Sequence, residues 1–116
     1  MDTIGIAKRF QQLHQRREHV SLTLEYIEKE RKEAEKNTDW LDQAAYESRI
    51  AFLDRLCDWY IRECGEIDEA IHRIETDRYG FCVACHSAID SHRLELFPQV
   101  AFCLACQQAR DSVETL

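Results

Sequence analysis

Apolar side chains in the first third of the chain recur at alternating spacings of four and three residues. The positions in this register are Ile6, Phe10, Leu13, Val20, Leu24, Ile27 and Ala34, with Arg17 and Arg31 interrupting it. Such spacing is the a/d repeat of a coiled-coil helix. The stretch from Ile6 to Cys64 contains neither Gly nor Pro, so the sequence predicts long, continuous helix rather than loops.

A second apolar repeat runs from about Asp42 to Arg78. Its members are Ala45, Leu53, Leu56, Tyr60, Ile67, Ile71 and Ile74. Phe52 and Trp59 lie beside this repeat, and we expect them to widen it into a thicker core.

Two cysteines, Cys57 and Cys64, lie on one face of this second helix. Their spacing corresponds to about 10 Å along a helix axis, which is too far for a direct disulfide. Both are therefore interpreted as buried free thiols that pack as small hydrophobic side chains.

The two repeats are separated by Asn37, Thr38 and Asp39. These side chains favour turns and helix caps because they compete for backbone N–H groups. Asp39 followed by Asp42 resembles a capping box, with an acid in the first turn of the second helix. Apolar repeats of similar length on both sides favour an antiparallel hairpin over one unbroken helix that dimerises. The sequence thus predicts a mainly α fold, with a coiled-coil hairpin over residues 1–78 and its tip near residues 37–42.

The remaining residues, 79–116, are expected to form a small head that ends in a short helix from Ala105 to Val113. Four cysteines stand in this segment with the spacing C-x₂-C-x₁₇-C-x₂-C: Cys82, Cys85, Cys103 and Cys106. This spacing is a strong zinc signal, because two short knuckles each present two thiolates to one tetrahedral ion. Four thiolates leave no coordination position for water, so the sequence predicts one structural zinc ion.

Other arrangements of these cysteines stay open at this point. Cys85 and Cys103 could form a disulfide, or the four could act as two redox pairs or hold an iron–sulfur cluster. His86 or His92 could replace one cysteine ligand, although four correctly spaced cysteines suffice and both histidines are interpreted as loop residues. Disulfide scaffolds are usually loop-rich, so a largely helical chain favours zinc.

Charge argues against nucleic acid as the partner of the head. The net charge is −7 and the isoelectric point about 5.2. From Gly80 to Leu116 there are two basic residues, Arg93 and Arg110, against four acidic ones. A DNA-binding surface needs clustered positive charge to meet the phosphates, so sequence-specific DNA binding is not expected.

Membrane and enzyme classes are not indicated either. No apolar run approaches the roughly 20 residues of a membrane span, and the first nine residues lack the apolar region of a secretory signal. A cytoplasmic location is therefore expected. His14, His19 and His72 have no nucleophile or carboxylate pair near them in sequence, so no catalytic set is predicted.

The cysteine-containing head (residues 79–116, called the finger below) and the tip together resemble the DksA/TraR family of transcription regulators. The segment Asp39–Ala45 (DWLDQAA) is similar to the family's tip motif D-x-x-D-x-A, and Arg78–Cys82 (RYGFC) is similar to its entry into the finger. Arg93-Leu94-Glu95 followed by Pro98 is similar to its finger loop. The resemblance covers most of the chain and implies a coiled coil that enters the secondary channel of RNA polymerase without binding DNA directly. It further implies that Asp39, Asp42 and Ala44 contact the polymerase.

Departures from the family pattern lead to two further expectations. Several members respond to the alarmone ppGpp through basic residues at positions that here hold Glu66, Phe97 and Gln107. Because none of these is basic, the resemblance implies a weak or absent ppGpp response. Family members usually have glycine after the second cysteine, whereas this chain has His86 there. Histidine tolerates a positive φ less easily than glycine does.

Two other functions remain compatible with the sequence. One is a zinc-stabilised adaptor or scaffold whose hairpin binds a different protein, and the other is a thiol-redox protein. Asp39 and Asp42 could likewise serve only to cap the second helix.

Overall fold

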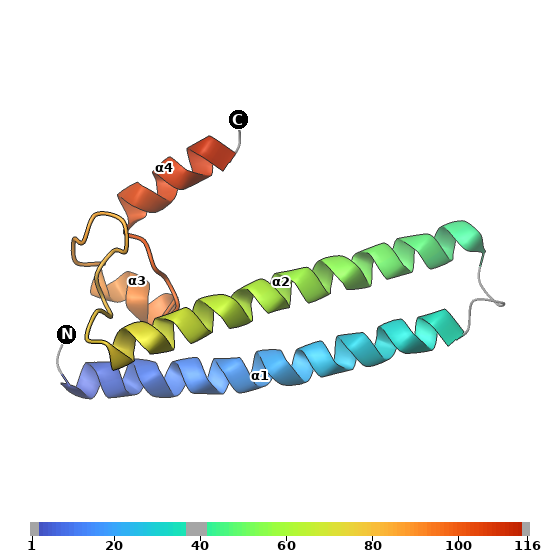
Figure 1. Cartoon of the computed structure of the whole chain (residues 1–116), viewed down its shortest axis with the longest axis horizontal. Helices are drawn as coiled ribbons and strands as arrows, with labels where there is room; N and C mark the ends of the chain where they lie inside the picture. Colours follow the sequence, from blue (N-terminus) through green and yellow to red (C-terminus); the bar gives the residue numbers. More distant parts are fainter. Residues whose placement is uncertain (1–2, 37–41, 115–116) are drawn as a thin grey trace. The chain divides into compact units, whose positions relative to one another are not determined.

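The computed structural model of the chain describes residues 3–36 and 42–114. Within these ranges lie the helices α1 (Thr3–Lys36), α2 (Gln43–Glu75), α3 (Ser91–Leu96) and α4 (Leu104–Glu114) (Figure 1). An isolated antiparallel bridge joins Phe81 and Ala88. The mainly helical fold with two long helices is confirmed, and so is the break between them, since α1 ends at Lys36 and α2 begins at Gln43.

Contacts within the chain define two compact units. One is Arg16–Gly65, and the other combines Met1–Gln15 with Glu66–Leu116. Each long helix therefore contributes to both units, and the end of α2 belongs with the finger. This grouping differs from the boundary predicted between residues 78 and 79, which stays a prediction about how the chain is organised into domains.

The unit Arg16–Gly65 is a pair of antiparallel helices (Figure 1). Its core repeats every seven residues along α1, where Val20, Ile27 and Ala34 are buried. Leu53 and Cys64 are the buried apolar residues that α2 contributes. This pattern confirms one of the two positions of the a/d repeat predicted for the first helix, and Cys64 is buried as predicted. Phe10, which the prediction placed at the other position, is exposed.

Ion pairs join the two helices of this unit. Arg16 binds Glu63 with Nη2–Oε1 at 2.8 Å, Arg31 binds Asp54 with Nε–Oδ1 at 2.8 Å, and Arg49 binds Glu30 with Nη2–Oε2 at 3.1 Å. Residue numbers rise along α1 as they fall along α2, which fixes the antiparallel register. Exposed pairs of this kind contribute little free energy individually, so the buried repeat accounts for most of the stability of this unit.

The prediction that Phe52 and Trp59 belong to the core is wrong. Their exposed fractions are 53% and 65%, whereas Leu53 is 7% exposed. Successive side chains on a helix point about 100° apart, so a helix that buries Leu53 turns Phe52 outward. Trp59, two turns further along, points in the same direction as Phe52. Ala45 is also exposed, and Cys57 is only half-buried.

The second unit has a separate core around the finger. Its buried apolar side chains are Leu13 from α1, Ile67 and Ala70 from α2, and Tyr79, Cys82, Ile89 and Leu94 from the finger. The short helix α3, which the sequence did not predict, is capped by Asp90, whose side chain accepts a hydrogen bond from the His92 backbone N–H. The terminal helix predicted from Ala105 to Val113 is confirmed by α4. In the ranges that the structure describes, no helix is long and apolar enough to cross a membrane.

Candidate metal centre

The first cysteine knuckle is shaped by backbone hydrogen bonds around Cys82. The Cys82 N–H donates to the Ser87 carbonyl at 2.8 Å, and the His86 N–H donates back to the Cys82 carbonyl at 3.0 Å. This tight turn requires a left-handed backbone at His86, where φ is 64°. The expectation that His86 occupies a position better suited to glycine is therefore confirmed.

The second knuckle is built on the start of α4. The Cys103 carbonyl accepts a hydrogen bond from Gln107 N–H at 2.9 Å, and the Cys106 N–H lies 3.5 Å from the Cys103 sulfur. The Val83 N–H donates to the Ala101 carbonyl at 2.9 Å. This last bond connects the first knuckle to the segment that precedes the second knuckle, so the two pairs of thiols face one another.

The four sulfur atoms of Cys82, Cys85, Cys103 and Cys106 lie within 4.8 Å of one another. Zinc–sulfur bonds of about 2.3 Å in a tetrahedron require sulfurs about 3.8 Å apart, and the Cys85 and Cys103 sulfurs are 3.7 Å apart. A disulfide would need about 2.05 Å, and all six cysteines are free thiols. The donor set fits a single structural zinc ion and leaves no open coordination position. Neither His86 nor His92 belongs to the cluster.

The surroundings of these thiols already favour partial ionisation. Hydrogen bonds to the backbone of Cys103 and Cys85 lower the pKa of Cys82 to about 6. Hydrogen bonding with the Cys103, Cys82 and Cys85 side chains raises the pKa of Cys106 to about 12. Four thiolates this close repel one another, so a divalent cation is needed for all four to stay deprotonated together.

Side chains around the cluster connect the finger loop to its frame. The Tyr79 hydroxyl donates to the Pro98 carbonyl at 2.9 Å, and burial raises the pKa of Tyr79 to about 12. Arg93 Nε donates to the Phe102 carbonyl at 3.4 Å, and the Arg110 guanidinium lies 4.4 Å from the centre of the Phe102 ring. Both arginines of the finger therefore contact the finger itself.

The predicted tip is described only in part. Asp39 lies outside the described residues. Asp42 and Ala44 are exposed, and the Asp42 carbonyl accepts the Tyr46 N–H at 3.0 Å. Asp42 thus lies at the N-cap position, just before α2. The predicted capping box instead placed it within the first turn.

Sequence reasoning missed the role of Arg73 altogether. This residue is 8% exposed, and its Nη2 donates to the carbonyls of Gln99 and Val100 at 3.4 and 3.3 Å. An arginine in the last turn of a helix is normally interpreted as a surface residue. Its burial follows from the way the finger loop folds back on α2, which no local pattern predicts.

The four-cysteine cluster falls in a segment that matches a known zinc-finger family. The model of the prokaryotic dksA/traR C4-type zinc finger matches residues 77–111, which include all four clustered cysteines. The chain belongs to the DksA/TraR family. The zinc predicted from cysteine spacing is confirmed by this match together with the sulfur geometry.

Longer similarities extend beyond the finger. In two strains of Caulobacter vibrioides, the RNA polymerase-binding transcription factor DksA is 30% identical to this chain over 83 residues. The match covers 72% of this chain but only 58% of that DksA. The structure of transcription factor DksA2 from Pseudomonas aeruginosa superposes with a TM-score of 0.87 at 24% identity, covering 100% of this chain and 90% of DksA2. At 24% identity, the match to DksA2 shows a shared fold.

Proposed function

We propose that this protein is a non-enzymatic transcription regulator that binds RNA polymerase, with the tip of its coiled coil in the secondary channel. The observation that carries the proposal is the 83-residue similarity to an RNA polymerase-binding DksA. The family's finger matches only residues 77–111, so the similarity must include part of the paired helices. A regulator of this kind acts in the cytoplasm, where we place the protein.

In this proposal zinc has a mechanical role. Cys82, Cys85, Cys103 and Cys106 would hold it, and the ion supplies cross-linking rather than a reactive ligand position. Tyr79 and Arg73 connect the loop around Pro98 to the end of α2 through hydrogen bonds to backbone carbonyls. The finger thereby fixes the end of the helix that leads back from the tip.

The surface supports a protein partner better than a nucleic acid. Phe52 and Trp59 share one exposed face of α2. Arg49 lies one turn before Phe52 and Glu63 one turn after Trp59, and each is paired with α1. Because residues three or four apart share a helix face, ion pairs frame the two aromatic side chains at both ends.

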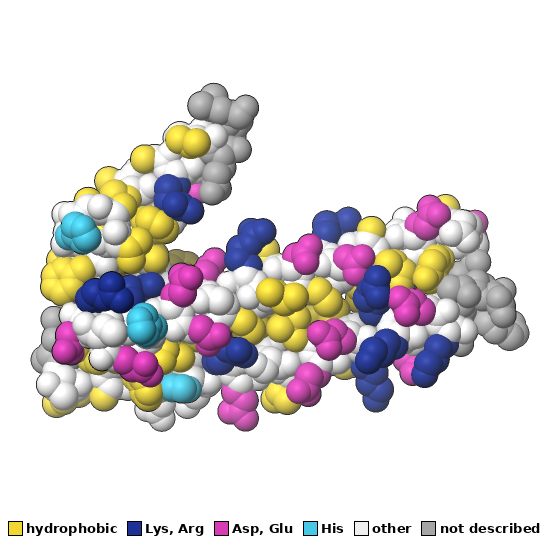
Figure 2. Space-filling view, viewed as in Figure 1, with side chains coloured by type: hydrophobic (Ala, Val, Ile, Leu, Met, Phe, Trp, Pro, Cys, Tyr) yellow, Lys and Arg dark blue, Asp and Glu magenta, His cyan; other side chains and the backbone are white. Residues whose placement is uncertain are grey.

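Tyr26 extends this surface, since it lies one turn from Glu30 on α1 and is 64% exposed. We call Tyr26, Phe52 and Trp59 the aromatic edge. Hydrophobic side chains are visible at the surface of α1 and α2 among acidic and basic ones (Figure 2). Aromatic side chains of this type bury about 150–250 Å² when covered, so the edge offers roughly 350 Å². That area suits one part of a larger protein interface.

A weak or absent ppGpp response is part of the proposal. Glu66 and Phe97 are exposed and Gln107 is half-buried, so the corresponding surface offers a carboxylate, a ring and an amide. None of these supplies the charge-assisted bonds that a polyphosphate needs. Adding ppGpp should leave the effect of the protein on transcription unchanged.

Exchange of the tip acids tests the proposal. In transcription reactions with purified polymerase, Asp39→Asn with Asp42→Asn should abolish the regulatory effect, while the melting temperature stays within a few degrees because asparagine also caps helices. The matched control is Glu18→Gln with Glu25→Gln, which removes the same charge from exposed positions of α1. It should regulate like the unmodified protein.

Two outcomes would count against this function. If the tip variant regulates normally, the acids act only as helix caps. If the unmodified protein neither binds polymerase nor changes transcription, the hairpin serves a different protein and the chain is an adaptor.

A further inference from the structure

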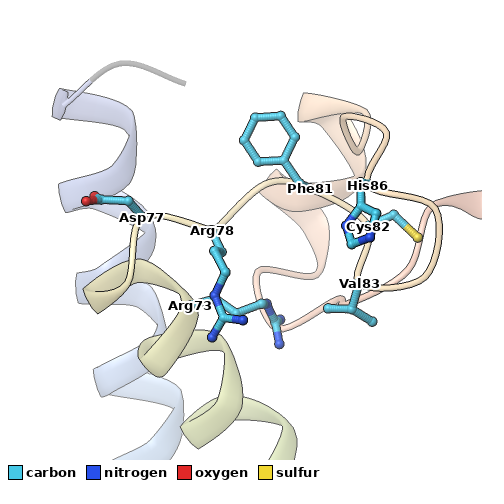
Figure 3. Close-up of a pocket in the computed structure, with 7 residues that line it drawn as sticks. All are labelled: Arg73, Asp77, Arg78, Phe81, Cys82, Val83 and His86. Atoms are coloured by element: carbon cyan, nitrogen blue, oxygen red, sulfur yellow. The ribbon is translucent and has the colours of Figure 1, made fainter.

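A cavity of about 280 Å³ lies where the end of α2 meets the first cysteine knuckle. Figure 3 shows its lining, in which Arg73 and Arg78 come from α2 and the turn after it, and Val83 and His86 come from the knuckle. None of the three positions that correspond to the family's ppGpp-responsive residues, Glu66, Phe97 and Gln107, lines it. Two guanidinium groups in one small cavity need a physical explanation.

The helix cap at the end of α2 brings the two arginines together. The Arg78 N–H donates to the Arg73 carbonyl at 2.8 Å, and the Asp77 N–H donates to the Ile74 carbonyl at 3.3 Å. With Asp77 at φ 58°, this is a Schellman motif, which places the side chains of its first and last residues next to each other. Those positions are commonly apolar, and here both are arginine.

Arg73 is a buried cation without an ion-pair partner. It is 8% exposed, and no carboxylate among the described residues lies within 4.0 Å of its guanidinium. Its two hydrogen bonds, at 3.4 and 3.3 Å, are long and go to uncharged carbonyls. Burial lowers the pKa of Arg73, the more distant Glu69 raises it, and the charge of Arg78 lowers it again. Unpaired buried charge is costly, so a counter-ion would stabilise this arrangement.

Acidic side chains do not fill that role from within the cavity. In Figure 3 the Asp77 carboxylate points away from both guanidinium groups. Asp68 and Glu69 line a neighbouring, shallower opening that shares both arginines, and these carboxylates would repel an anion approaching from that side. His86 lines the cavity but not that opening, so entry beside His86 avoids these carboxylates.

Two structural explanations for the arginines are weaker. The dipole of α2 favours positive charge at its C-terminal end, which explains a surface arginine but not a buried one. A zinc ion with four thiolates carries a net charge of −2, which two arginines would offset. The Cys82 sulfur, however, points away from the guanidinium groups in Figure 3.

We propose that Arg73 and Arg78 bind a phosphate group in this cavity, either as free phosphate or as part of a small phosphorylated molecule. Two guanidinium forks match the charge and the several acceptor oxygens of a phosphate. Val83 provides an apolar wall that could cover an attached organic group. Binding would hold the end of α2 against the knuckle, and this site does not depend on the proposed polymerase contact.

The test is a calorimetric titration of the zinc-loaded full chain with inorganic phosphate and, in a second arm, with glycerol 3-phosphate, both at constant ionic strength. Arg78→Gln should weaken binding about tenfold or more, because it removes a charge-assisted pair. The control Arg62→Gln, an exposed arginine on α2, should bind like the unmodified chain. Tighter binding of the phosphoester than of phosphate would identify a small phosphorylated molecule as the ligand, and the reverse would identify the free ion.

The proposal is overturned if neither probe binds at millimolar concentration or if Arg78→Gln binds as tightly as the unmodified chain. It is also overturned if Arg78→Gln lowers zinc affinity while leaving phosphate binding unchanged, because the arginines would then only balance the thiolates. Arg78 is exposed, so its replacement should leave the fold intact, and a helical circular dichroism spectrum checks this.

Discussion

The paired helices of Arg16–Gly65 and the finger are stabilised by different means. The helices bury a repeating apolar stripe and add ion pairs across the surface. The finger has four buried apolar residues, Tyr79, Cys82, Ile89 and Leu94, and one of them is a zinc ligand. Stability in the first region is distributed over many side chains, whereas in the second it is concentrated in one ion.

This difference has a functional consequence. A repeating core tolerates surface change, so the helices can carry exposed acids and aromatic side chains for a partner. The finger is too small to fold on apolar burial alone, but a metal site gives it a fixed geometry. In the proposed function, the finger fixes the end of α2 and the paired helices contact the partner.

Removing zinc should have the largest effect. Structural zinc sites contribute roughly 10–16 kcal/mol to folding, so chelation or Cys103→Ser should unfold α3, α4 and both knuckles. Most of the helical circular dichroism signal at 222 nm should persist, because α1 and α2 have 34 and 33 residues. Fluorescence of Trp40 and Trp59, which lie outside the finger, should change little.

The matched control for this experiment is Cys57→Ser, a free cysteine outside the cluster. It should retain one zinc ion per chain. Cooperative loss of the entire helical signal on chelation would show that the two regions do not differ as described.

The next largest effect is expected from the repeating core. Leu53→Ala should lower the free energy of unfolding by about 2–4 kcal/mol, because it leaves a cavity in the core, while zinc content stays at one ion. Phe52→Ala, at the adjacent exposed position, should change it by less than about 0.5 kcal/mol. Urea unfolding followed by circular dichroism measures both. Equal losses for the two variants would mean that α2 presents a different face to α1.

Tyr79 should make the finger sensitive to alkaline pH. Its pKa rises from 10.0 to about 12 in the folded protein, so folding favours the neutral phenol. That contribution is complete below pH 10 and is lost as the pH rises through 12. Tyr79→Phe should cost about 1 kcal/mol at neutral pH through the lost bond to Pro98, and should flatten the fall in finger stability between pH 10 and 12. Thermal melts across this range provide the measurement.

The smallest effect is expected at the first knuckle. His86 has φ 64°, a conformation that costs an L-residue about 1 kcal/mol. His86→Gly should therefore raise the chelator concentration needed to unfold the finger, by up to about fivefold. His86→Ala keeps the Cβ and should give no gain. A gain for both variants would attribute the effect to loss of the imidazole rather than to the backbone.

Local patterns predicted most of this molecule. The spacing of Leu13, Val20, Ile27 and Ala34 predicts the buried stripe of α1, because a helix repeats on itself nearly every seven residues. Cysteine spacing predicts the metal centre for a similar reason, since a knuckle is a local structure. The glycine-like conformation of His86 was expected only from the resemblance to the family, whose members usually have glycine at that position.

What the sequence could not supply depends on contacts between distant segments. Phe52 and Leu53 are both large and apolar, and only the packing of α2 against α1 decides which one is buried. Arg73 is buried by a loop that lies more than twenty residues further along the chain. Its position next to Arg78 depends on the left-handed conformation of Asp77. An aspartate can adopt this conformation, but its presence in the sequence does not predict it.

The most direct measurement of the central claim is a photo-cross-linking experiment on reconstituted promoter complexes. A photoreactive side chain replaces Asp42, and a control chain carries it at Glu18. The proposed function predicts a zinc-dependent cross-link from position 42 to a polymerase subunit, with none to DNA and little from position 18. A cross-link to DNA, or no cross-link from position 42 while the zinc-loaded protein is intact, would contradict it.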